Sequence, residues 1–324
     1  MLSAMPRARK HLVCVSSTPY YHVVSRCVRR AFLCGADNTS GKDYEHRRGW
    51  IEKRVRVLSS LFSIKVCAYA IMSNHYHLVV KLSPDEAAHW SDDEVLERWT
   101  ALFRGPLLVQ QYRDGKSLTP IETDTLRATT AVYRARLSDL SWFMKCLNEP
   151  IARKANAEDG CTGHFWEARF RSQALCTERA LLAAMAYVDL NPIRARLADK
   201  PEQSDYTSLQ ARVAEHETTD LSSALYSMLH SGDLRHTNIA TRPLMPFLDS
   251  THQASDTLPI RGTDYLTLVD TAGRLSVCGK RGRISPALAP ILARLGVSAE
   301  QWLPAATAFR DHYWNGDLRL KQPA

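Results

Sequence analysis

The sequence lacks paired cysteines, long apolar runs and internal repeats, and each absence narrows the class of protein. Its eight cysteines are scattered without a Cys-x-x-Cys pair, and several lie in apolar patterns, which favours reduced thiols. No apolar stretch is long enough to span a bilayer, and the basic residues 1–10 are not followed by the apolar block of a secretion signal. We therefore expect a cytoplasmic protein without a membrane partner.

Positive charge exceeds negative charge in this chain. The 324 residues include 42 Lys and Arg against 34 Asp and Glu, a formal net charge of +8. The excess lies mainly in the N-terminal half, between Arg7 and Arg56. Such a field favours a polyanionic partner, nucleic acid before membrane, although solvated helix faces explain any single cluster equally well.

The first 82 residues predict a βαββ unit. Strand-like alternation over residues 20–27 precedes a helical pattern over 44–62, and strand patterns follow over 63–72 and 75–82. The short connection between the last two strands makes them antiparallel neighbours. We therefore predict an α+β fold with a ferredoxin-like antiparallel sheet and helices on one face.

The rest of the chain is interpreted as an elaboration of that unit. Residues 84–137 change composition and indicate a helical insertion, and 137–157 a core helix. Residues 163–173 alternate like a strand, with Trp166 on one side and Arg169 and Arg171 on the other. A helix over 178–190 begins at the cap residue Thr177 and ends at Asn191-Pro192.

The length admits two domains or one elaborated domain. We expect a main domain over 1–212, a linker over 213–243 and a helical C-terminal extension over 244–324. Helices are expected within that extension at residues 263–273, 285–295 and 299–317.

Two histidines on the fourth predicted element are the most informative residues. Side chains two apart on a strand share a face, so His75 and His77 point one way and Tyr76 the other. Two imidazoles aimed at one spot form half of a metal site. The same pair also occurs as structural zinc ligands, or as two hydrogen-bonded, half-buried histidines.

The helix over 178–190 carries a tyrosine away from its apolar stripe. Leu181, Met185 and Val188 form that stripe, whereas Tyr187 lies among alanines with Asn191 one turn later. This arrangement leaves space around the hydroxyl. A tyrosine ring packed in the core is the alternative interpretation.

Arginines and one tryptophan are candidate nucleic-acid contacts. Trp166, Arg169 and Arg171 suit single-stranded DNA, because bases stack on aromatic rings and phosphates pair with guanidinium groups. A half-buried edge strand explains the same pattern. The next candidates follow the first strand: Arg26, Arg29 and Arg30.

Four blocks in this order resemble the single-tyrosine transposases of the HUH superfamily, including those associated with repetitive extragenic palindromes (REP). The blocks are CAYAIMSNHYHLVV at 67–80, LSWFMKCLN at 140–148, GHFWEARFRS at 163–172 and AYVDLNPIRARL at 186–197. The resemblance covers roughly the first two thirds of the chain and is interrupted by the insertion.

The resemblance implies roles for four residues. His75, His77 and Asn191 would bind a divalent cation, and Tyr187 would be the nucleophile. Its attack on single-stranded or hairpin DNA would give a 5′-phosphotyrosine and a free 3′-OH, and the reverse attack would join strands without ATP. Two imidazoles and an amide oxygen are intermediate ligands, and the substrate phosphate adds hard oxygens, which favours Mg²⁺ or Mn²⁺ over a closed zinc site. Tyr187 could serve its own subunit or a partner in a homodimer.

Other functions fit part of the sequence. Chains of this kind also act as host nucleases on palindromic repeats, or as regulators that bind DNA hairpins without cutting. An amidohydrolase also uses His-x-His on a strand, but its fold needs about eight βα repeats, which are not found here. A purely structural nucleic-acid binder would use only the basic N-terminal half. The segment GADNTSGKD departs from a phosphate-binding loop in spacing and in its final residue.

Overall fold

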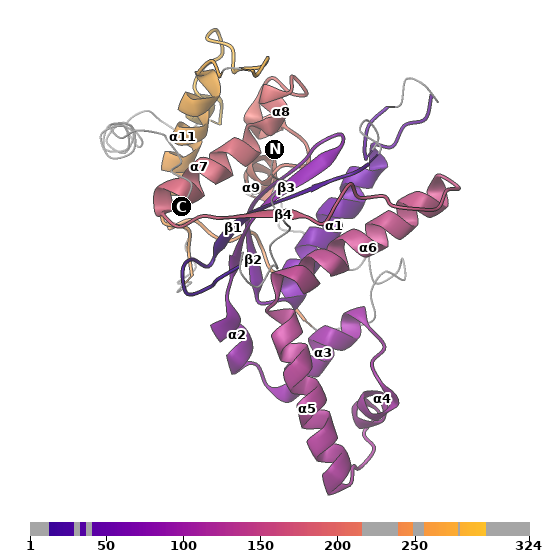
Figure 1. Ribbon diagram of the computed structural model, residues 1–324. Coiled ribbons are helices and arrows are strands. Elements are labelled where there is room, and N and C mark those ends of the chain that lie inside the picture. The colour runs from indigo at the N-terminus through magenta and orange to yellow at the C-terminus, as the bar shows by residue number, and fades with distance from the viewer. Residues whose placement is uncertain are drawn as a thin grey trace, which may run out of the picture.

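A four-stranded antiparallel sheet in the order β2-β3-β1-β4 forms the centre of the protein (Figure 1). The computed structural model describes residues 13–28, 33–36, 41–215, 239–248, 256–277 and 279–295. The strands are β1 (Tyr20–Arg26), β2 (Ile64–Ile71), β3 (His75–Leu82) and β4 (Arg171–Ala174). This order is that of a ferredoxin-like βαββαβ unit, so the predicted α+β fold class is confirmed.

Helices cover both faces of the sheet, so the prediction of helices on one face is wrong. The helices α1 (His46–Leu61) and α6 (Leu140–Glu158) pack on the face that carries Tyr76. On the other face, α7 (Glu178–Asp189) packs against β2 and β3 over Ala68 and Val79. Strands β2 and β3 are therefore buried on both sides, which explains their nearly continuous apolar sequences.

Part of the basic excess of the N-terminal half is used inside the protein. Arg47 on α1 is fully buried and donates hydrogen bonds to Glu158 and Asp159 at the end of α6. Arg54 on the same helix donates to the carbonyl of Cys146 at 2.7 Å. These arginines stabilise the contact between α1 and α6 and are not part of a solvent-facing field.

The predicted insertion is helical and projects from the end of the molecule opposite α7 (Figure 1). Its helices are α2 (Pro84–His89), α3 (Asp92–Leu102), α4 (Leu107–Arg113) and α5 (Pro120–Leu137). Trp99 on α3 stacks on Tyr133 of α5, with ring centroids 4.5 Å apart, and contacts Trp142 of α6 at 5.4 Å. Aromatic packing therefore joins the insertion to the core.

The predicted strand over residues 163–173 is largely wrong. Only its last residues pair with β1, as part of β4, and Trp166 makes a single bridge to Cys27. Phe165 and Phe170 are both buried, although strict alternation would place them on opposite faces. The chain leaves the strand path because a loop can bury both rings.

The C-terminal segment packs on α7 through a shared apolar core. The elements that follow α7 are α8 (Asn191–Arg194), the 3-10 helix η2 (Pro201–Gln203), α9 (Ser208–Glu215), α11 (Gly262–Arg274) and α12 (Ile291–Arg294). The helix predicted at 263–273 is confirmed as α11. Of 285–295 only α12 is helical, because Pro286 and Pro290 interrupt the pattern. The helix predicted at 299–317 lies outside the described residues, as do residues 216–238 of the predicted linker.

Candidate functional site

The two histidines of β3 lie side by side on the face of the sheet covered by α7. The rings of His75 and His77 are 4.8 Å apart between centroids. Tyr76 points to the opposite face, where its hydroxyl donates to the side-chain oxygen of Asn148 at 2.5 Å. Because β3 is paired on both edges, its backbone holds the two imidazoles in a fixed relation.

Helix α7 places Tyr187 beside the histidine pair. Its stripe of Leu181, Met185 and Val188 is buried against the sheet, as the sequence predicts. The ring of Tyr187 lies 5.6 Å from that of His77, edge to face. Tyr187 is nevertheless 43% exposed, so solvent and a large substrate can reach it.

Asn191 lies directly after α7, as the first residue of α8, and is buried. Its side-chain nitrogen donates to the carbonyl of Tyr187 at 3.0 Å. This bond fixes the amide and leaves its oxygen, which is only an acceptor, for another partner.

Burial keeps both histidines neutral near pH 7. It lowers the pKa of His75 to about 4, with Arg26 and Lys280 lowering it further. It lowers the pKa of His77 to about 2, with His75 and His22 as the next causes. A neutral imidazole keeps one ring nitrogen as a lone pair, the form that binds a metal ion.

The histidine pair leaves a polar atom without a partner. The Nε2 atom of His77 is buried and has no hydrogen-bond partner among the described residues. Within that part of the chain, no group of three or more His, Cys, Asp or Glu side chains is arranged to hold a metal ion. A cation here would therefore need the Asn191 amide or substrate oxygens as further ligands.

A basic groove lies on the same face of the sheet. Arg26, Arg169 and Arg171 are exposed and line a hollow of about 100 Å³ together with Val24, Glu167 and Ala168. Arg26 lies opposite His75 in the β1–β3 register. Val24 lies opposite His77 on one side and Arg171 on the other, so residues that line the groove are cross-strand neighbours of the histidines. Arg29 and Arg30 lie outside the described residues.

Trp166 is held largely by the protein interior. Its indole N–H donates to the carbonyl of Asn148 at 2.9 Å, and its ring lies edge-on to Tyr76 at 5.7 Å and to Phe165 at 5.0 Å. The half-buried ring therefore has a packing role, and its predicted contact with DNA stays a prediction.

Two residues near the histidines were not predicted from the sequence. His22 of β1 lies with its Nε2 atom 3.0 Å from Nδ1 of His77. Lys280, from the segment after α11, is close enough to lower the pKa of both metal-candidate histidines. Strand alternation places His22 on one face with Val24, but the sequence does not give the register that brings it to His77.

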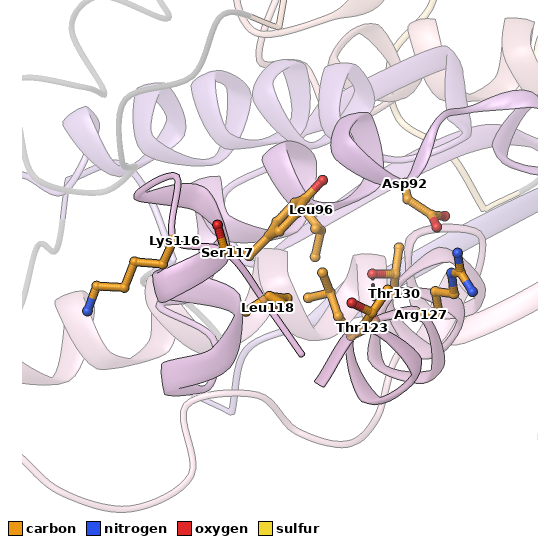
Figure 2. A pocket seen from close by; sticks show the side chains of 10 residues that line it. Asp92, Leu96, Lys116, Ser117, Leu118, Thr123, Arg127 and Thr130 are labelled. Carbon is orange, nitrogen blue, oxygen red and sulfur yellow. Dashed lines mark hydrogen bonds between the residues drawn. The ribbon is translucent and has the colours of Figure 1, made fainter. Parts of the chain in front are cut away.

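A larger cavity, of about 390 Å³, lies within the helical insertion (Figure 2). Figure 2 shows Asp92 beside Arg127 at one side, with Leu96 and Leu118 near the centre. None of the candidate catalytic or metal-binding residues lines it. It also lies at the other end of the molecule from α7, so it is separate from the histidine site.

Comparison with known proteins adds one solved structure. No family model matches the sequence, and no curated protein matches it. The solved structure is described as "Structure of the REP associates tyrosine transposase bound to a REP hairpin". It is similar over 65% of this chain and 87% of that chain, with 10% sequence identity and a TM-score of 0.33.

No described helix of this chain is long and apolar enough to cross a membrane.

Proposed function

We propose that this protein is a DNA transposase that cleaves and rejoins single-stranded DNA through a tyrosine nucleophile and a divalent cation. The observation that carries the proposal is the position of Tyr187, half-exposed and 5.6 Å from the ring of the buried His77. The four sequence blocks that resemble single-tyrosine transposases contain both of these residues.

The reaction needs one covalent exchange in each direction. The Tyr187 oxygen attacks a phosphodiester phosphorus, forming a Tyr–O–P bond while the bond from phosphorus to the 3′ oxygen breaks. The phenol gives up its proton and the departing 3′ oxygen takes one up, which yields a 5′-phosphotyrosine and a 3′-OH. Attack by another 3′-OH reverses these steps. The number of phosphoester bonds is unchanged, so no ATP is required.

The residues beside Tyr187, together with oxygens of the substrate phosphate, fit a divalent cation such as Mg²⁺ or Mn²⁺. His75, His77 and the Asn191 oxygen would hold Mg²⁺ or Mn²⁺, and the unpartnered Nε2 of His77 supports this assignment. When bound, such a cation offsets negative charge that develops on the scissile phosphate.

The basic groove would hold the DNA strand next to this site. Arg26, Arg169 and Arg171 present exposed guanidinium groups, which pair well with phosphate oxygens. Because Val24 and Arg26 line the groove and lie opposite His77 and His75, a DNA strand bound there would bring a phosphodiester toward Tyr187. We infer that hairpin DNA with a single-stranded flank is the substrate class.

The proposal is tested by covalent capture. Purified protein is incubated with single-stranded, hairpin-forming DNA from the flanks of its own gene, with Mg²⁺ or Mn²⁺, and analysed on a denaturing gel. We expect a DNA-linked band that requires metal and is absent in Tyr187→Phe and His75→Ala. Matched controls that should keep the band are Tyr112→Phe on α4 and His89→Ala on α2, two residues outside the site.

A hairpin-binding regulator without cleavage is the second candidate. It would use the basic groove, which does not depend on Tyr187. If the wild-type protein binds the DNA but never forms the linked band with either metal, the transposase proposal is overturned in favour of this regulator.

A further inference from the structure

His22 contacts one of the two histidines that the proposed function assigns to the metal. Its Nε2 atom lies 3.0 Å from Nδ1 of His77, and the two ring planes are within 14° of parallel, with centroids 5.1 Å apart. His22 is on β1, the strand adjacent to β3, and its ring also lies 6.1 Å from that of Tyr187. The contact therefore lies inside the candidate site.

The shared hydrogen bond decides which nitrogen of His77 can bind a cation. If His22 donates, Nδ1 of His77 is the acceptor and its Nε2 must carry the proton of the neutral ring. That N–H would then be buried without an acceptor, which is unfavourable. If His77 donates through Nδ1–H, its Nε2 keeps the lone pair, which is the form that a metal ion needs.

The tautomer of the neighbouring His75 is fixed by a hydrogen bond in the same way. Nδ1 of His75 lies 2.5 Å from the side-chain oxygen of Asn74. A carbonyl oxygen only accepts, so His75 donates through Nδ1 and keeps its lone pair on Nε2. Both histidines would then present the same ring nitrogen to one cation.

We propose that His22 is a positioning residue that accepts the Nδ1–H of His77 and so directs the Nε2 lone pair of His77 toward the divalent cation. The inference rests on the metal site of the proposed function and deepens it. Partners of this kind fix the ring orientation and tautomer of a ligand, and their loss typically weakens metal binding about 10–100-fold.

The tautomer is measured first in the metal-free protein. Long-range ¹H–¹⁵N correlation spectra of ¹⁵N-histidine-labelled protein distinguish a protonated Nδ1 from a protonated Nε2, and His77→Gln identifies the His77 signals. We expect wild-type His77 to be protonated on Nδ1 and His22→Ala to populate both tautomers. A wild-type His77 protonated on Nε2 would overturn the inference.

Metal binding is then measured by calorimetric titration with Mn²⁺. We expect His22→Ala to weaken binding about 10–100-fold, and His22→Gln, whose amide oxygen can accept the same hydrogen bond, to recover most of the loss. Equal affinity of wild type and His22→Ala, or equal weakness of the Ala and Gln variants, contradicts the role of His22. If wild type binds Mn²⁺ no better than His75→Ala, the metal site itself fails. Circular dichroism melting of each variant separates these outcomes from unfolding.

Discussion

Asp189 is a fully buried carboxylate two residues after the candidate nucleophile. It accepts hydrogen bonds from the Ser208 hydroxyl at 2.6 Å, the Leu209 backbone N–H at 3.0 Å and the Tyr265 hydroxyl at 2.5 Å. Burial raises its pKa, and the three donors oppose that shift. One side chain thus ties α7 to α9 and to α11.

Replacing this carboxylate should lower the free energy of unfolding. Asp189→Ala leaves buried donors on Ser208, Leu209 and Tyr265 without an acceptor, and each costs roughly 1–3 kcal/mol. Urea unfolding followed by circular dichroism measures the loss. The control is Asp124→Ala on α5, at a side chain 79% exposed, which should stay within about 0.5 kcal/mol of wild type. An Asp189→Ala variant as stable as this control would contradict the anchoring role.

Some site residues follow from the sequence and others do not. Strand alternation is a local property, so the common face of His75 and His77 can be predicted from the sequence alone. The contact of His22 with His77 depends on how β1 and β3 pair, which the pattern within one strand does not encode. Lys280 comes from a segment distant in the chain and has no local signal of its own.

At the scale of elements, α7 is the part that positions Tyr187. Its buried stripe faces β2 and β3, and its start is fixed by Thr177, whose hydroxyl accepts from the backbone N–H of Ala180 at 3.1 Å. The helix is thus fixed at its start by a cap and near its end by Asp189. The sequence predicts this helix closely because stripe, cap and terminating proline agree.

The Thr177 cap should contribute to the free energy of unfolding more than to the formation of the DNA-linked band. Thr177→Ala removes the side-chain acceptor and should lower the free energy of unfolding by about 1 kcal/mol. Thr177→Ser keeps the hydroxyl and should remain near wild type. Because the buried stripe still seats α7, we expect both variants to keep the DNA-linked band at temperatures where they are folded. Loss of the band in folded Thr177→Ala would show that the helix start also sets the tyrosine position.

The segment over residues 163–170 has a strand pattern in its sequence but does not form a strand. Its alternating aromatic and charged residues indicate a strand, but only the residues from Arg171 onward pair fully with β1. Phe165 and Phe170 both enter the core that lies under α1 and α6. The burial of two large rings outweighed the local strand preference, and this competition depends on the assembled core.

For the whole molecule, net charge alone does not show where a polyanion would bind. The chain carries a formal charge of +8, yet Arg47 and Arg54 are buried in internal hydrogen bonds. The exposed arginines of the groove lie on the histidine face instead. Composition predicts that the partner is a polyanion, whereas the path of that polyanion requires the folded sheet.

Salt dependence of DNA binding tests this path. If Arg26 and Arg171 each neutralise one phosphate of single-stranded DNA, each alanine substitution should reduce the slope of log K against log salt by about 0.7. Fluorescence anisotropy with a labelled oligonucleotide at several salt concentrations measures the slope. Arg153→Ala on α6, a 73% exposed arginine on a helix that covers the other face, should leave it unchanged. Equal slopes for all four proteins would place the DNA elsewhere.

The ties of Asp189 also have a consequence for biosynthesis. Its donors lie 19, 20 and 76 positions later in the chain, and the last of them is Tyr265. A growing chain therefore contains Tyr187 well before α7, the helix that carries it, can be fully anchored. All three hydrogen bonds can form only after Tyr265 has been synthesised. During synthesis, α7 would therefore first be held by its cap, its buried stripe and the two donors on α9, and only later by α11.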